Sequence, residues 1–328
     1  MYDDAGFRRH PITLKPFPTV TLFAALALIL ASGVPLHAAD AASVATTVTA
    51  HATHAVSKID AGSLLTRFSA GFVSELVRYV IAAGGAFVLF YVWRIRRLRA
   101  MKIQPAYPEA KDIRREVLYS LSSMAIFACT GVLIYLMNRA GWTRIYGKIE
   151  PRGWGYLAFS VVALILAHDT WFYWTHRFMH WKPIFPLVHR VHHLSRNPTP
   201  WAAFAFHPIE AVIEAGIFPL VAMVMPVHPL AALIWLLYMT GMNVLGHCGF
   251  EILPSGFTRH AIFRWHNTTT HHDMHHRFLH RNFGLYYNFW DRLMGTNHER
   301  YDEEFEKVKA RAGSVAPKEQ EAVESSTR

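Results

Sequence analysis

Cysteine is nearly absent from the chain, which has only Cys129 and Cys248. Because they lie far apart in sequence, they indicate neither a cysteine metal motif nor a disulfide framework, and we expect both to be buried thiols. Charged residues are also scarce, at 17% of the chain, whereas hydrophobic residues make up 52% and aromatic residues 14%. This composition is typical of an integral membrane protein rather than of a soluble globule.

Other sequence patterns are missing as well. The chain has no His-Glu-x-x-His pattern, which argues against a membrane metalloprotease, and no haem-binding or flavin-binding module is evident. Lys and Arg outnumber Asp and Glu by 33 to 23. The densest basic run, 94–102, flanks a long apolar run. We therefore assign the positive charge to anchoring beside anionic lipid, and expect no nucleic-acid partner.

Long apolar runs predict the membrane spans. A first run near 18–34 follows basic residues and precedes small ones, so we interpret 1–42 as either a signal-like segment or an uncleaved anchor. Residues 43–70 lack periodicity and are predicted to be a linker. Residues 71–109 are predicted to hold a membrane helix and the basic cytoplasmic loop. Further apolar runs lie near 115–138, 154–174, 206–226 and 229–247.

The predicted fold is an all-α, polytopic membrane bundle. It has a four-span core, an N-terminal hydrophobic segment and a cytosolic, helical, histidine-rich metal cap. The positive-inside rule places 94–102 in the cytoplasm, and counting spans from there returns 176–193 and 260–298 to the same side. Basic residues between 139 and 152 count against this orientation. In a bacterium, the membrane would be the inner one.

Histidine is the most informative residue type. Seventeen of the 21 histidines lie between His168 and His298, mostly three or four residues apart. Positions at this spacing share a helix face, and neutral imidazole binds iron, zinc and copper. Nine imidazoles and the Asn243 amide are more than one ion can hold, so we predict two metal ions. The nine are His176, His180, His189, His192, His193, His247, His272, His275 and His276.

A histidine-rich membrane metal transporter is the main alternative. Its ligands are expected near the bilayer midplane on broken helices, whereas these histidines fall at helix ends and in loops. A metal-binding scaffold without catalytic activity is a further alternative, but it predicts looser spacing.

The order of the motifs resembles the fatty acid hydroxylase and sterol desaturase superfamily. His-Asp-x-x-Phe-Tyr-Trp-x-His-Arg-x-x-His stands at 168–180, and His-x-x-His-His stands at both 189–193 and 272–276. Asn-Phe-Gly at 282–284 and Phe-Trp-Asp-Arg-Leu-Met-Gly-Thr at 289–296 follow. Four ordered motifs carry far more weight than any one of them. The resemblance covers residues 110–300, which we interpret as the catalytic domain, and leaves 301–328 as a polar tail, disordered from Ala310.

The resemblance implies a non-haem di-iron oxidoreductase that uses O₂ and two electrons to hydroxylate or desaturate a lipid or sterol-like substrate. Because no redox module is evident, a separate electron-donor protein of the ferredoxin or cytochrome type is implied. Zinc can replace iron in a purified sample. Asn243 stands where some relatives have a histidine, and is expected to hold a metal-bound water; His271 is left out of the ligand set. The implied catalytic ligands are His176, His180, His192, His193, His275 and His276.

Two carboxylates are candidates for supporting the metal site. Asp169 lies two turns before His176 and is expected to accept a hydrogen bond from the second ring nitrogen of a ligand. Glu210 begins an apolar hairpin, where an unpaired carboxylate is costly, and is expected to orient His193 or His207. An ordinary interfacial carboxylate is the alternative for Glu210.

Overall fold

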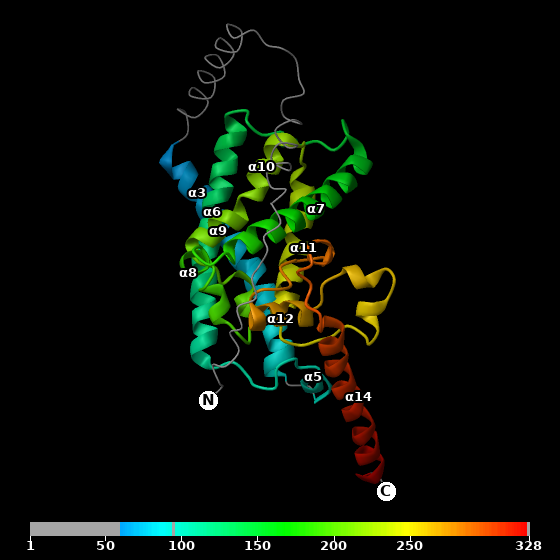
Figure 1. The fold of residues 1–328 in the computed structure, drawn as a ribbon. Helices are drawn as coiled ribbons and strands as arrows, with labels where there is room; N and C mark the ends of the chain where they lie inside the picture. The colour runs from blue at the N-terminus through cyan, green and yellow to red at the C-terminus, as the bar shows by residue number, and fades with distance from the viewer. Residues whose placement is uncertain (1–59, 94–95, 327–328) are drawn as a thin grey trace. The chain divides into compact units, whose positions relative to one another are not determined.

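The computed structural model describes residues 60–93 and 96–326, and this part of the chain is helical, with isolated bridges as its only β pairing (Figure 1). The signal-like or anchor segment 1–42 and residues 43–59 of the predicted linker lie outside the described residues. The longer helices are α3 (Ala61–Tyr79), α6 (Ala110–Arg139), α7 (Gly153–Met179), α9 (Pro208–Ala215), α10 (Ile217–Val224), α11 (Pro229–His247), α12 (Thr269–Phe278) and α14 (Tyr301–Ser326).

Four helical stretches are long and apolar enough to cross a membrane: Ala61–Val92, α6, α7 and α11. Their outward faces carry large apolar side chains, which a soluble helix would bury. Cys129 is also exposed, on α6, so only Cys248 fulfils the expectation of a buried thiol. The prediction of a polytopic helical membrane protein is confirmed.

The first described helix begins earlier than predicted. Asp60 Oδ1 accepts a hydrogen bond from Ser63 N at 2.7 Å and caps α3, which continues through η1 (Val80–Gly84), α4 (Gly85–Phe87) and η2 (Val88–Val92). The linker boundary at residue 70 was therefore wrong. The first turns of α3 mix polar, small and apolar residues, so they show no continuous apolar run. They are stabilised by packing on α6, where the Arg67 guanidinium lies 3.6 Å from the Tyr135 ring.

The predicted single span at 206–226 was wrong as well. The chain forms two short helices there, α9 and α10, divided at Gly216. Eight residues rise only about 12 Å, so neither helix crosses the bilayer alone. α9 buries Glu210 and Glu214 in the bundle. The second arm of the predicted hairpin, α11, forms as one helix.

The polar tail is helical rather than disordered. α14 extends to Ser326, and its first turns bury Tyr301, Phe305 and Val308 against the rest of the fold. Arg300 also pairs with Glu304, at 2.9 Å. The sequence prediction overlooked this helix because three apolar residues among many charged ones give a weak signal.

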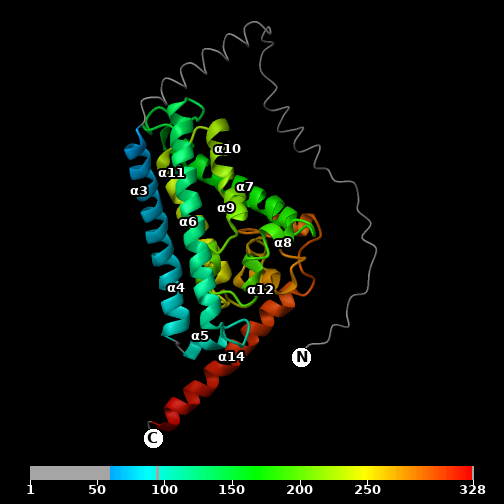
Figure 2. The ribbon, with the colours of Figure 1, turned by 90° about the vertical axis from the view of Figure 1, so that its left-hand side faces the viewer.

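The short helices gather where the long ones end. Figure 2 shows α3 and α6 side by side, with α8 (Phe185–Val188) and α12 below α7, α9 and α10. α12 packs on α11 near His247, and Thr269 Oγ1 donates to the Leu245 carbonyl at 2.8 Å. The remaining short elements are α5 (Arg96–Ala100), η3 (His192–Leu194), η4 (Pro200–Phe204), η5 (Phe257–Arg259), η6 (Phe263–Trp265) and α13 (Phe289–Leu293).

The loop between α12 and α13 requires glycine at position 284. A Cβ there would overlap the Tyr287 carbonyl oxygen and lie 3.0 Å from Asp291 Oδ2. We predict that Gly284→Ala destabilises the fold by about 1–3 kcal/mol. Gly241→Ala in α11 is the control, because its Cβ meets nothing within 4 Å. Thermal unfolding in detergent is the measurement; equal melting temperatures for Gly284→Ala and wild type would contradict the prediction.

Candidate metal centre

The nine histidines predicted as ligands come from five places in the chain. His176 lies in the last turn of α7, and His180 follows that helix. His189 follows α8, and η3 carries the next pair. His247 is the last residue of α11, and α12 carries three more. The structure brings all nine together.

The rings form two groups, within each of which one nitrogen per ring lies within 4.8 Å of all the others. The group of five is His176, His180, His189, His193 and His275; the group of four is His192, His247, His272 and His276.

Each His-His pair is divided between the two groups. His192 and His193 are consecutive, yet they contribute to different groups, and so do His275 and His276. The two groups are therefore neighbours: the rings of His193 and His276 lie 4.8 Å apart, centroid to centroid. Two cations held by these groups would share one buried space.

The Nε2 atoms face inward in both groups. In the group of five, His176 Nε2 lies 3.0 Å from His189 Nε2, and His180 Nε2 lies 3.2 Å from His275 Nε2. In the group of four, the Nε2 atom of His247 lies 2.9 Å from that of His272 and 3.3 Å from that of His276.

The outer ring nitrogens show which atom carries the proton. Nδ1 lies 2.8 Å from the Phe283 carbonyl oxygen in His176, 2.7 Å from the Asn243 carbonyl oxygen in His247 and 2.7 Å from the Arg281 carbonyl oxygen in His275. A carbonyl oxygen only accepts, so these Nδ1 atoms must donate. In the neutral ring, Nε2 then holds a bare lone pair.

Bare lone pairs that converge at about 3 Å repel one another unless a cation lies between them. Metal–imidazole bonds of about 2.0–2.1 Å place neighbouring nitrogens about 2.9 Å apart around an octahedral ion and about 3.3 Å apart around a tetrahedral one. The observed Nε2 separations of 2.9–3.3 Å fall in this range. The donor set therefore fits two transition-metal ions.

Burial keeps the rings neutral. Desolvation lowers the pKa of His189, His193 and His275 well below its usual value, and neighbouring histidines lower it further. Only the neutral ring can bind a metal ion through Nε2, so the environment maintains the ligands in the form that binding requires.

Glu210 supports the site, but through a different histidine from those predicted. Its Oε1 accepts the Nδ1 proton of His189 at 2.7 Å, and both side chains are buried. His193 and His207 were the predicted partners. The difference arises because His189 follows α8, which packs on α9.

Asp169 does not have the predicted role. Its Oδ1 accepts from the main-chain N–H groups of Tyr286 and Tyr287, at 2.8 and 3.3 Å, rather than from a ligand histidine. It thus fixes the loop that carries the Phe283 carbonyl. This loop places the acceptor for His176, so Asp169 acts one step further from the rings than predicted.

The Asn243 side chain is directed elsewhere in this structure. Its Nδ2 donates to the Ala203 carbonyl at 2.5 Å, while its own carbonyl accepts from His247. Asn243 thus positions a ring through its main chain. Sequence reasoning overlooked the acceptor carbonyls of Phe283 and Arg281, and the Asn-Phe-Gly motif next to them was the only available signal.

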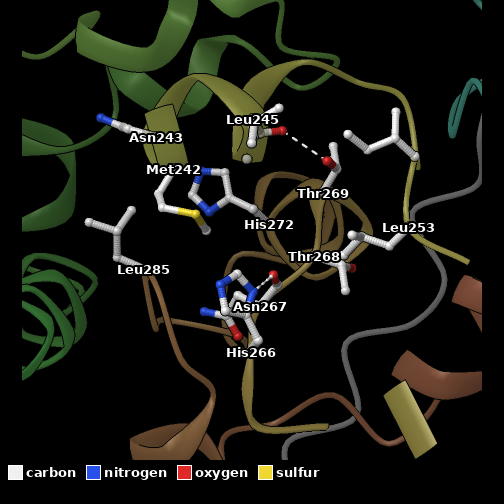
Figure 3. A pocket seen from close by; sticks show the side chains of 12 residues that line it. Met242, Asn243, Leu245, Leu253, His266, Asn267, Thr268, Thr269, His272 and Leu285 are labelled. Atoms are coloured by element: carbon white, nitrogen blue, oxygen red, sulfur yellow. Dashed lines mark hydrogen bonds between the residues drawn. The ribbon is translucent and has the colours of Figure 1, made fainter. Parts of the chain in front are cut away.

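A small pocket of about 70 Å³ reaches the group of four (Figure 3). His272 lines it, with Met242 on one side and Thr269 on the other. His271, which was left out of the predicted ligands, belongs to neither group; its Nε2 lies 3.6 Å from Asp291 Oδ2.

Comparison with known proteins identifies relatives of this helical membrane protein. Residues 161–296 match the fatty acid hydroxylase family. Lathosterol oxidase of Mus musculus is 29% identical over 187 residues, which are 56% of this chain and 61% of that protein. Delta(7)-sterol 5(6)-desaturase of Gibberella zeae is 28% identical over 228 residues, which are 70% and 67% of the two chains. The alignment thus covers less than two thirds of the lathosterol oxidase. No solved structure matches the chain.

The fold and the histidine groups define a class, the polytopic helical membrane proteins with a histidine-rich centre. Within that class, the chain belongs to the fatty acid hydroxylase and sterol desaturase superfamily. The resemblance seen in the sequence motifs is confirmed.

The neutral rings predict acid sensitivity. In the unfolded chain, histidines titrate near pH 6.5, whereas burial lowers the pKa of folded His192 well below that value. Stability from the neutral ring is therefore fully present above about pH 6.5 and is lost as the pH falls toward the folded pKa. We predict that metal-depleted protein melts at a lower temperature at about pH 5 than at about pH 7.5.

The control compares two histidine variants. His192→Gln should flatten this pH dependence, while His260→Gln should not, because His260 is exposed. Melting curves at several pH values provide the test, and a pH dependence unchanged by His192→Gln would refute the explanation.

Proposed function

We propose that the protein is a membrane-bound oxidoreductase that holds two iron ions through its nine clustered histidines and uses O₂ and two electrons to hydroxylate or desaturate a lipid or sterol-like substrate. The observation that carries this proposal is the convergence of nine Nε2 atoms in two adjacent groups. Membership of the superfamily and the sterol-oxidising relatives support it.

The geometry favours this proposal over metal transport. The ligands of a transporter must release their ion, so they are expected on broken helices near the midplane. Here the rings are buried and several outer nitrogens have fixed acceptors, including the Glu210 carboxylate. Such an arrangement suits a resident cofactor.

The substrate would be oxidised at an unactivated C–H bond, which has no acidity for a general base to exploit. The bound iron ions would supply the redox chemistry. The residues of this chain hold and orient the ions and shape the path of the lipid. The Phe172 ring packs on His176 and the Phe206 ring on His192, with centroids 4.9 and 5.3 Å apart. These two rings limit the access of water from the bundle interior.

We also propose the orientation and the partners. The basic run 94–102 favours the cytoplasmic side for the histidine groups, and the inner membrane in a bacterium. A cytoplasmic electron-donor protein of the ferredoxin or cytochrome type would then reach the centre. Residues 110–300 form the proposed catalytic domain.

Removing one inward ring tests the metal centre. We expect His192→Ala to lose at least one of two bound metal ions per chain and to abolish lipid oxidation, because the group of four falls to three. His260→Ala is the control. Metal analysis of purified protein, with zinc counted beside iron, and lipid profiles of expressing cells are the measurements. An oxidised lipid that persists in His192→Ala would remove the catalytic proposal.

Replacing Glu210 tests the support of the ligand rings. Without its Oε1, the His189 ring loses its acceptor, and we predict that Glu210→Ala weakens metal binding by about 10- to 100-fold. Glu210→Gln retains a side-chain acceptor and should fall between this variant and wild type. Competition with a chelator of known affinity measures the change. Equal retention of metal by Glu210→Ala and wild type would show that the contact is only structural.

A further inference from the structure

A larger cavity lies inside the bundle, beside the metal centre. It has a volume of about 210 Å³ and is lined by side chains from α3, α6, α7, α9 and α11. Phe172 and Phe206 form part of its wall, and the same two rings pack on His176 and His192. A molecule in this cavity would thus lie next to both histidine groups.

Most of the wall is aromatic or aliphatic, and most of its polar groups have partners. Arg78 pairs with Glu75 in α3. Thr130 Oγ1 donates to the Ile126 carbonyl at 3.1 Å, and His168 Nδ1 lies 2.7 Å from the Tyr286 hydroxyl. These groups help to stabilise the bundle and leave little hydrogen-bonding capacity for a ligand.

Glu214 is the exception. It lines the cavity, its side chain is 9% exposed, and its Oε1 has no hydrogen-bond partner among the described residues. An unsatisfied buried oxygen costs about 1–3 kcal/mol, so a ligand that satisfies it gains affinity. Glu214 lies one turn after Glu210, on the same face of α9, which places it close to the rings.

We propose that Glu214 accepts a hydrogen bond from a hydroxyl group of the substrate, and that the cavity selects an apolar lipid alcohol over a free fatty acid. The inference rests on the proposed function and specifies its substrate class. An apolar body matches the aromatic wall, and a single hydroxyl matches the single free oxygen. A carboxylate ligand would face the Glu214 carboxyl, which disfavours it.

The test compares two ligands that differ only in the hydroxyl. Lathosterol and cholest-7-ene, the corresponding hydrocarbon, are bound to the full-length, metal-loaded protein in detergent micelles, and oleic acid is the carboxylate probe. We expect wild type to bind lathosterol at least about 10-fold more tightly than the hydrocarbon. Glu214→Leu should abolish this preference, and Glu214→Gln should retain most of it.

A matched control lies in the same cavity. Thr130→Val removes a hydroxyl that is already satisfied inside α6 and should leave the preference unchanged. Equal affinity of wild type for the two sterol probes, tighter binding of oleic acid, or an unchanged preference in Glu214→Leu would each overturn the proposal. If Glu214→Leu does not fold, the wild-type comparison still decides.

Metal content distinguishes this failure from failure of the proposed function. A protein that holds two iron ions but ignores the hydroxyl refutes only the role of Glu214. A protein that binds no metal refutes the proposed function itself.

Discussion

The convergence of bare imidazole lone pairs is the constraint on which the rest of this structure depends. Each ring must present Nε2 inward, and the ring orientation is stable only where Nδ1 finds an acceptor. Those acceptors are main-chain carbonyls of Asn243, Arg281 and Phe283 and the carboxylate of Glu210, from α11, the loop after α12 and α9. The centre therefore requires the assembled bundle, and no single helix can form it.

The loop after α12 shows how far this requirement extends. Asp291 accepts hydrogen bonds from the N–H groups of Phe283 and Gly284, at 2.9 and 2.8 Å, and Asp169 holds the next turn. Burying two carboxylates is costly, but several N–H donors offset the cost. Their effect is to fix the Phe283 carbonyl against His176. A glycine at 284 permits the tight approach of the Asp291 carboxylate.

The nine ring positions could be predicted because helical spacing is a local property. Their division into five and four could not, since it depends on tertiary packing: the consecutive His192 and His193 separate only because η3 lies between the two groups. The same limit explains the errors on the carboxylates. A sequence shows that Asp169 and Glu210 are candidates for hydrogen bonding, but their partners belong to segments 21 to 118 residues away.

The break at Gly216 follows the same logic and connects the centre to the cavity. An unbroken helix over 206–226 would cross the bilayer, where two carboxylates one turn apart would be costly. Ending α9 after Ala215 keeps both carboxylates in the interior: Glu210 contacts a ligand histidine, and Glu214 faces the cavity. α9 thus links the position of His189 to the wall that receives the substrate. A shift of this helix would change the metal group and the cavity together.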